Sequence, residues 1–157
     1  MADMYGYSGR LLIVDLTSKE TKTEEISEGL CRNFIGGNGF SIYLSHKYQK
    51  PGIDSLSPDN VLVFAVGPFS GTAVPTSAKY VIRARSPLTG FQGKSIGSSF
   101  WSLAFRRAGY DALVIKGRAE KPTYLFIDDD IVEFRDDKAI AHWGIMDSAA
   151  MMQQLGG

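Results

Sequence analysis

The sequence has 157 residues, of which 44% are hydrophobic and 22% charged, and this suits one compact domain that buries most of its apolar surface. Lysine plus arginine and aspartate plus glutamate each total 17, so no bulk field favours nucleic acid or an anionic membrane, and any anion site has to be local. The single cysteine, Cys31, excludes an internal disulfide and a zinc or iron–sulfur site made of this chain's own thiolates. With no apolar run near the ~18 residues of a membrane span, we expect a cytoplasmic protein that contacts no membrane.

The pattern at the start of the chain predicts a β-hairpin followed by a helix. An apolar run at 11–14, a polar turn at 15–20 and alternation at 21–26 are typical of paired strands. Ser27 is placed to cap a helix whose first turn carries Glu28, a favourable charge at the positive end of the helix dipole.

That helix is interrupted by Gly36-Gly37-Asn38-Gly39, because each glycine costs roughly 1 kcal/mol in a helix interior. Three glycines in four residues indicate that something approaches this backbone closely. Helical spacing resumes at Phe40 and ends before Pro51, and the apolar run 61–66 predicts a strand buried on both faces.

A second succession of strand, helix and apolar strand follows, so we expect two similar α+β halves. Its predicted elements are a strand at 79–85, a turn at 86–90, a helix at 99–108 stopped by Gly109, a strand at 112–115 and a hairpin of 123–127 with 131–134. Residues 149–157 indicate the start of a helix without a closing element, which suggests a fragment of a longer protein.

The strand at 79–85 carries its cations on one face. Period-two geometry places Lys79, Arg83 and Arg85 together and sets Tyr80 opposite to them. Such a face can bind phosphate through charge-assisted hydrogen bonds, but an edge strand also carries lysine and arginine for solubility. The pattern alone leaves both interpretations open.

A loop at 94–99 is the better candidate for an anion site. Lys94, Ser95, Ile96, Gly97, Ser98 and Ser99 lead directly into a predicted helix, whose first backbone N–H groups are free to bind an anion. Capping by Ser98 or Ser99 would explain the serines without any ligand, although it would not explain Gly97 and Lys94.

Other polar residues make weaker candidates. His46 and His142 have no neighbours at metal-ligand spacing, and the carboxylates at 24–25 and 128–130 are typical of solvated turns. The sequence contains no nucleophile elbow, Walker loop or dinucleotide fingerprint, so no catalytic group is predicted.

Several short motifs nevertheless follow one another in a recognisable order. They are Gly-Gly-Asn-Gly at 36–39, Leu-Ser-Pro-Asp-Asn at 56–60, Gly-Pro-Phe-Ser-Gly-Thr at 67–72, Ser-Pro-Leu-Thr-Gly-Phe at 86–91 and Ala-Gly-Tyr-Asp-Ala at 108–112. In this order and spacing they resemble the N-terminal domain of tungsten-containing aldehyde ferredoxin oxidoreductases, and the resemblance covers nearly the whole chain.

The resemblance implies a single domain, 1–157, whose two related halves form a saddle for tungsten, or molybdenum, held by two pyranopterin dithiolenes with a magnesium ion between their phosphates. It also implies later helical domains with a [4Fe-4S] cluster. The whole enzyme would oxidise small aldehydes to carboxylic acids and pass electrons to ferredoxin, and family members are often homodimers. The isolated chain would not be active.

The same resemblance assigns site residues. Lys79 stands where the family usually has an arginine that contacts the pterin phosphates, and Ile96-Gly97-Ser98-Ser99, preceded by Ser95, stands where the family commonly has Asn-Ser-Gly-Gly. Ile96 would bind magnesium through its backbone carbonyl, which does not depend on the side chain. Two alternatives remain, a non-catalytic pterin-binding or assembly subunit, and a domain whose ligand site has decayed.

Overall fold

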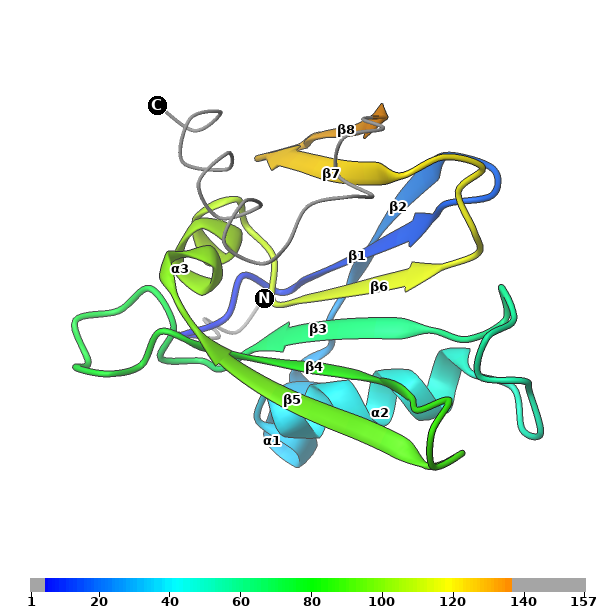
Figure 1. The fold of residues 1–157 in the computed structure, drawn as a ribbon. Coiled ribbons are helices and arrows are strands. Elements are labelled where there is room, and N and C mark those ends of the chain that lie inside the picture. Colours follow the sequence, from blue (N-terminus) through cyan, green and yellow to red (C-terminus); the bar gives the residue numbers. More distant parts are fainter. Residues whose placement is uncertain (1–4, 137–157) are drawn as a thin grey trace. The chain divides into compact units, whose positions relative to one another are not determined.

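A computed structural model describes residues 5–136 of the chain, and it divides into two compact units after Arg118. The first unit contains a six-stranded sheet and three helices, and the second contains a two-stranded hairpin (Figure 1). The α+β fold class that the sequence predicts is therefore confirmed. His142 and the helix start expected at 149–157 lie outside the described residues.

The sheet of the first unit is mixed. Its strands are β1 (Arg10–Asp15), β2 (Glu20–Glu25), β3 (Leu62–Val66), β4 (Lys79–Arg85), β5 (Gln92–Ser98) and β6 (Ala112–Lys116), in the spatial order β2-β1-β6-β3-β4-β5. Only β1 and β6 run parallel, and every other neighbouring pair is antiparallel. β2 and β5 are the two edges, so each has backbone groups without a strand partner.

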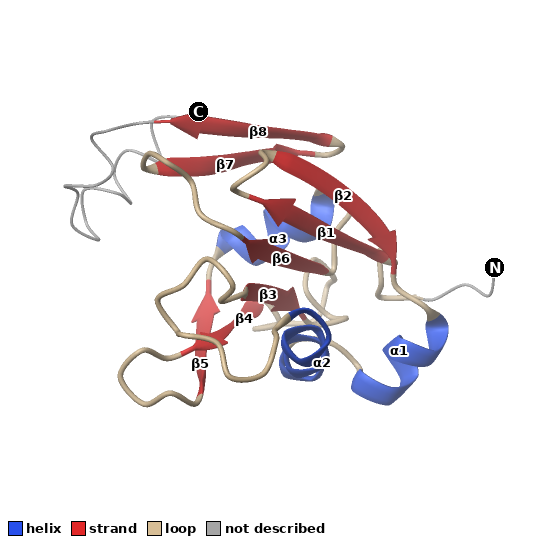
Figure 2. Cartoon of the chain, turned by 90° about the vertical axis from the view of Figure 1, so that its right-hand side faces the viewer, coloured by secondary structure: helices blue, strands red, loops and turns tan. Residues whose placement is uncertain are grey.

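The three helices are α1 (Glu28–Phe34), α2 (Asn38–Tyr48) and α3 (Phe100–Arg107), and they cover opposite faces of this sheet (Figure 2). Val63 and Ala65 of β3 share a buried cluster with Phe40 and Leu44 of α2. Phe64, which points to the other face, packs against Trp101 of α3 with ring centroids 5.4 Å apart. Burial of β3 on both faces, as its apolar run predicts, follows from this sandwich.

The predicted helix break is real, and the close neighbour is the chain itself. Ser27 caps α1 by accepting a hydrogen bond from the backbone N–H of Leu30 at 3.2 Å, and α2 begins two residues earlier than predicted, at Asn38. A Cβ on Gly39 would collide with the backbone carbonyl of Phe34 at the end of α1. Glycine at 39 therefore lets the first turn of α2 approach the backbone at the end of α1 closely.

One predicted loop is wrong. Residues 94–98 belong to β5, which pairs in full register with β4 and reaches the helix without an intervening loop. β5 is an edge strand that buries few side chains, so its residues are mostly small and polar. It therefore lacks the alternation of apolar and polar residues by which strands are recognised in a sequence. Ser99 is the N-cap of α3, and its hydroxyl accepts from the Trp101 N–H at 3.2 Å.

The predicted repeat exists in the order of the elements. A hairpin, a helical segment and a strand occur first as β1 to β3 and then as β4 to β6. The two successions differ in how their first strand pairs with the last strand of the other succession. β1 lies parallel to β6, whereas β4 lies antiparallel to β3. Both successions contribute to one sheet.

The second unit contains β7 (Thr123–Asp128) and β8 (Ile131–Asp136), which form the hairpin expected from the sequence. Its two-residue turn, Asp129-Asp130, has Asp129 at φ 49°, a conformation that aspartate tolerates. Within residues 5–136, no helix is both long and apolar enough to cross a membrane.

Candidate functional site

An open cavity of about 430 Å³ lies where β4 begins, β5 ends and α3 starts. Three residues singled out in the sequence line it, namely Lys79, Ser98 and Ser99. Lys79 and Ser98 are direct cross-strand partners, and antiparallel partners place their side chains on the same face. Sequence patterns did not indicate the other lining residues, which are Thr76, Ala78, Phe100 and Leu103.

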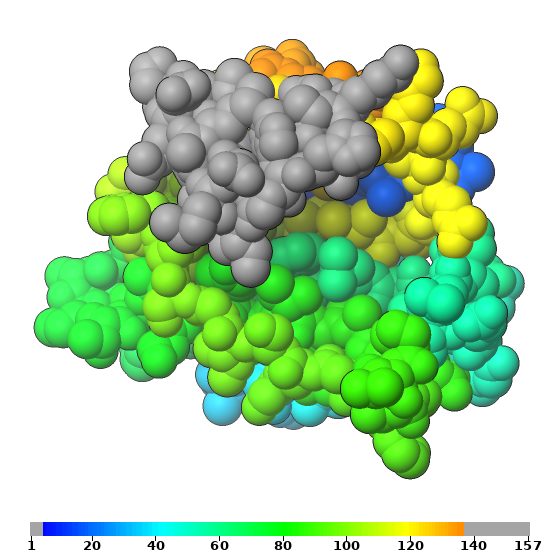
Figure 3. Space-filling model, in the orientation of Figure 1, coloured from blue at the N-terminus to red at the C-terminus, as the bar shows by residue number. Residues whose placement is uncertain are grey.

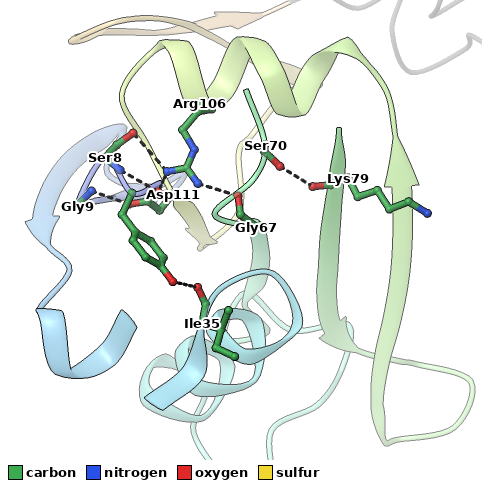
Figure 4. A network of polar contacts seen from close by, with 9 residues as sticks. Ser8, Gly9, Ile35, Gly67, Ser70, Lys79, Arg106 and Asp111 are labelled. Carbon is green, nitrogen blue, oxygen red and sulfur yellow. Dashed lines mark hydrogen bonds and ion pairs between the residues drawn. The ribbon is translucent and has the colours of Figure 1, made fainter. Parts of the chain in front are cut away.

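The polar groups of this cavity suit an anion. Lys79 is exposed, and its ammonium makes no hydrogen bond or ion pair with any residue between 5 and 136. Its side chain extends away from the polar network behind it (Figure 4). Phe100, 85% exposed, gives the cavity an apolar side. An ammonium beside hydroxyls and an apolar wall can hold a phosphate carried on a planar organic group.

The backbone of Lys79 is fixed by a buried serine. Ser70 is 2% exposed, and its hydroxyl lies 3.1 Å from the Ser77 carbonyl and 3.3 Å from the Lys79 carbonyl. The Lys79 N–H donates to Ser77 at 2.7 Å. Ser70 thus ties the loop after β3 to the first residue of β4, and it orients the residue that presents the ammonium.

A buried ion pair fixes the other end of the same loop. Arg106 of α3 pairs with Asp111, and it also donates to the Gly67 carbonyl at 2.8 Å. Asp111, fully buried, accepts from the backbone N–H groups of Ser8 at 3.1 Å and Gly9 at 2.7 Å. The pair therefore joins the N-terminal segment, α3 and the loop after β3 (Figure 4).

Sequence reasoning missed this ion pair. Arg106 lies in the last turn of α3, where an exposed cation would complement the helix dipole, yet its side chain is only 11% exposed. Burial lowers the pKa of its guanidinium to about 10, so it remains charged at neutral pH beside the carboxylate. The motif Ala-Gly-Tyr-Asp-Ala at 108–112 was the available signal, and its aspartate has a structural role.

Gly97 also has a structural explanation. The Tyr80 ring lies directly over Gly97 on the neighbouring strand, and a Cβ there would fall well inside van der Waals contact with that ring. Tyr80 in turn packs against Trp101, with centroids 4.8 Å apart. Glycine at 97 therefore allows an aromatic side chain to cover the edge strand.

The register shows where the Ile96 carbonyl points. Next to the hairpin turn, the Ser86 N–H donates to the Phe91 carbonyl at 2.8 Å. Along the two strands from this pair, residue pairs that do not exchange backbone hydrogen bonds alternate with pairs that do. The pairs 84/93, 82/95 and 80/97 then exchange backbone bonds, whereas 83/94, 81/96 and 79/98 do not. The N–H and C=O of Ile96 accordingly face outward from the sheet edge.

Contacts on β4 agree with this alternation. The backbone N–H and C=O of Arg85 bond to the side chain of Asn60, and those of Lys79 bond to Ser77 and Ser70, on the side away from β5. Both residues belong to pairs that exchange no backbone bond with β5.

The remaining predicted site residues lie on β5 outside the cavity lining. Ser95 and Gly97 share the face that carries Tyr80, while Ile96, 55% exposed, shares the face of Val81. The cationic face of β4 is divided, because Arg83 turns to α2 and donates to Ser41 at 3.2 Å and to Asn38 at 2.8 Å. Only Lys79 of its cations reaches the cavity.

The weaker candidates take no part in this site. His46 is an exposed residue of α2, Cys31 is buried, and no group of three metal-ligating side chains occurs among the described residues. The carboxylates at 24–25 lie in β2, not in the turn expected for them. Glu24 accepts from Lys22 and Tyr48 at 2.9 Å each and from Lys47 at 3.2 Å.

Comparisons with known proteins agree with this fold. The tungsten-containing aldehyde ferredoxin oxidoreductase of Pyrococcus furiosus is 42% identical over 90% of this chain, and that of Thermococcus kodakarensis is 39% identical over 98%. The WOR-like subunit of an aliphatic sulfonate oxidoreductase of Pyrococcus furiosus is 39% identical over 90% of the chain. The chain spans only 23% to 26% of the length of these relatives.

A solved structure matches as well. The active-site complex BamBC of benzoyl coenzyme A reductase, determined with 1,5-dienoyl-CoA, superposes with a TM-score of 0.90 and 27% identity over 96% of this chain and 23% of its own. The family model for the aldehyde ferredoxin oxidoreductase N-terminal domain matches residues 11–156. The chain therefore belongs to the aldehyde ferredoxin oxidoreductase N-terminal domain family.

Proposed function

We propose that this chain supplies one wall of a tungsten or molybdenum bis-pyranopterin site in an enzyme that oxidises aldehydes to carboxylic acids. The observation that carries the proposal is the ammonium of Lys79, which has no partner among residues 5–136 and lies in a cavity with Ser98 and Ser99. The names of the relatives supply the tungsten and the aldehyde chemistry.

The donor set in the cavity fits a phosphorylated pterin. Lys79 contributes a positive charge, and the hydroxyl of Ser98, its cross-strand partner, has no hydrogen-bond partner within the described part of the chain. These groups suit the terminal phosphate, and the apolar side formed by Phe100 and Leu103 suits a flat organic ring. The lysine provides charge without the two-pronged geometry of an arginine.

Magnesium between the phosphates would be bound through backbone oxygen. The outward-facing carbonyl of Ile96 is the hard oxygen ligand that this ion prefers, and it lies on the strand that ends at the cavity. Isoleucine in place of asparagine leaves that carbonyl unchanged.

The bound metal would supply the redox chemistry, and this chain would bind and orient the cofactor. Lys79 and Ser98 would hold its anionic end, while Ser70 and Arg106 keep the supporting loop in place. Substrate binding, the [4Fe-4S] cluster and the ferredoxin surface would lie in further domains of the enzyme. We therefore expect the cofactor-loaded chain alone to reduce no dye with an aldehyde, and such activity would contradict this division of roles.

The role of Lys79 is tested by cofactor retention. The full chain and its Lys79→Gln and Lys79→Arg variants are expressed under conditions of pterin and tungsten supply, and both contents are measured after desalting. Lys79→Gln is expected to lower both at least about tenfold, because it removes a charge-assisted contact, whereas Lys79→Arg retains them. Lys19→Gln, an exposed charge change in the turn before β2, is the control.

Equal pterin and tungsten contents in Lys79→Gln and the parent chain would overturn the proposal. That result would favour a domain whose ligand site has decayed. A native gene that ended at residue 157 would instead favour a pterin-storage or assembly subunit over a part of an oxidoreductase.

A further inference from the structure

The β4–β5 hairpin carries more positive charge than the cofactor site uses. Arg83, Arg85 and Lys94 lie on one face of the hairpin, since Arg83 stands opposite Lys94 and Arg85 follows two residues after Arg83. No carboxylate among residues 5–136 forms an ion pair with any of the three. We name this set of three residues the hairpin cation cluster.

The register places two of these cationic residues directly opposite each other. The pair 83/94 exchanges no backbone hydrogen bonds, and in such pairs the side chains approach more closely than in bonded ones. Like charges directly opposite each other on one face are destabilising. A dianion between them would remove that repulsion.

The neighbouring helix supplies neutral partners only. Arg83 donates to the Ser41 hydroxyl and the Asn38 amide oxygen, and burial lowers the pKa of its guanidinium without a carboxylate to offset the effect. Arg85 has a buried Nε that lacks a hydrogen-bond partner among residues 5–136. The hydroxyl of Ser45, which lies one turn after Ser41 and is 3% exposed, also lacks a partner there.

These contacts define one polar seam between α2 and the hairpin. It begins where Asn38 and Ser41 meet Arg83, and it ends where Gln49 contacts Gln92, the cross-strand partner of Arg85. Polar groups that are buried without partners are costly, and they recur at positions that bind an ion or water. The outer side of the seam, at Lys94 and Gln92, is exposed.

We propose that the hairpin cation cluster is a second oxyanion site, which binds a phosphate dianion, free or carried as a monoester. Two guanidiniums and one ammonium match a dianion better than the single charge of a carboxylate. The space-filling view shows the turn between β4 and β5 at the molecular surface, and Lys94 beside it is exposed (Figure 3).

This site is distinct from the cavity at Lys79. Lys79 and Arg83 are four positions apart on an extended strand, which corresponds to roughly 13 Å. Their side chains also lead to different places, because Lys79 lines the cavity whereas Arg83 turns to α2 and donates to Ser41 and Asn38. The two sites can therefore be tested independently, and the second does not depend on pterin binding.

Titration of the isotopically labelled full chain with inorganic phosphate, followed by backbone amide shifts, tests the inference. The amides of Arg83 and Lys94 are expected to shift together and to saturate. Arg83→Gln and Lys94→Gln should each weaken this binding at least about fivefold, since each removes one charge-assisted contact. Lys79→Gln is the matched control on the same hairpin and should leave these shifts unchanged.

Glycerol phosphate in a second titration distinguishes the source of the anion. Tighter binding than inorganic phosphate would assign the site to a phosphate monoester, and equal or weaker binding would assign it to free phosphate. Shifts that do not saturate, or that persist unchanged in Arg83→Gln, would overturn the proposal. Loss of the shifts in Lys79→Gln alone would overturn it too, because the phosphate would then occupy the cofactor cavity.

Discussion

Charge is handled in opposite ways in two neighbouring parts of the first unit. At one, Arg106 is buried against Asp111, which also holds two backbone N–H groups of the N-terminal segment. At the other, Lys79 and the hairpin cation cluster have no carboxylate partner in the described part of the chain. A buried charge with a partner fixes the structure, whereas exposed or half-buried cations without one are available to a ligand.

The largest effect is expected from breaking the compensated pair. Asp111→Ala would leave the Arg106 charge buried and would free the N–H groups of Ser8 and Gly9, so the free energy of unfolding should fall by about 3–5 kcal/mol. Urea denaturation followed by circular dichroism measures this. Asp59→Asn, an exposed position, is the control. An unchanged midpoint would show that the pair contributes little to stability.

A smaller loss is expected where the hairpin meets α3. Gly97→Ala would push a Cβ into the Tyr80 ring, which also packs against Trp101, and should cost about 1–3 kcal/mol. Gly93→Ala is the matched control on the same strand, because its Cβ would lie 3.4 Å from the Ala84 carbonyl, an ordinary contact. Equal melting temperatures for the two variants would contradict this explanation of Gly97.

Acid should reveal a second compensated charge, that of Glu24. Lys22 and Tyr48, with a further contribution from Lys47, lower the pKa of Glu24 from 4.5 to about 2. A lowered carboxyl pKa adds stability that is complete above pH 4.5 and is lost as the pH falls toward 2. Because the group is partly solvated, we expect a loss of only about 1 kcal/mol, measured by denaturation between pH 2 and 7.

The matched variant for the acid experiment is Glu24→Gln. It should abolish this part of the pH dependence and lower stability at pH 7, while Glu25→Gln on the same strand should preserve it. An identical acid profile in the parent chain and Glu24→Gln would contradict the assignment.

Removing one of the uncompensated cations should raise the stability of the domain, whereas the changes above lower it. Lys94→Gln removes a like charge facing Arg83, so it should raise the free energy of unfolding by about 0.2–1 kcal/mol, and more at low salt. Chemical denaturation at two ionic strengths measures the effect. Destabilisation would mean that Lys94 has a stabilising partner, and the comparison with Arg106 would then fail.

Much of the fold was predictable from local pattern. Ser27, the apolar run at 61–66 and Gly109 mark element boundaries through signals that lie within a few residues of one another. β5 was missed because an edge strand with a glycine under Tyr80 lacks apolar alternation. Arg106 and Asp111 are only five positions apart in sequence, but the N-terminal N–H groups that explain the burial of the pair are about a hundred residues away.

The candidate site was predicted less completely than the fold. Lys79 and the serines before α3 were found because charge and capping chemistry are visible in single residues. Ser70 was missed, since its function depends on two carbonyls reached only after the loop folds. Residue type indicates what a group can bind, whereas its partners depend on register.

The alternation along β5 affects how this domain can change during evolution. Lys94, Ile96 and Ser98 direct their backbone groups outward because of where the hairpin closes, whatever their side chains are. Substitutions at these positions leave that outward row of backbone oxygens intact. Insertion or deletion of one residue in the turn would instead exchange outward for inward groups along the strand. Selection should therefore preserve the length of this hairpin more strictly than its composition.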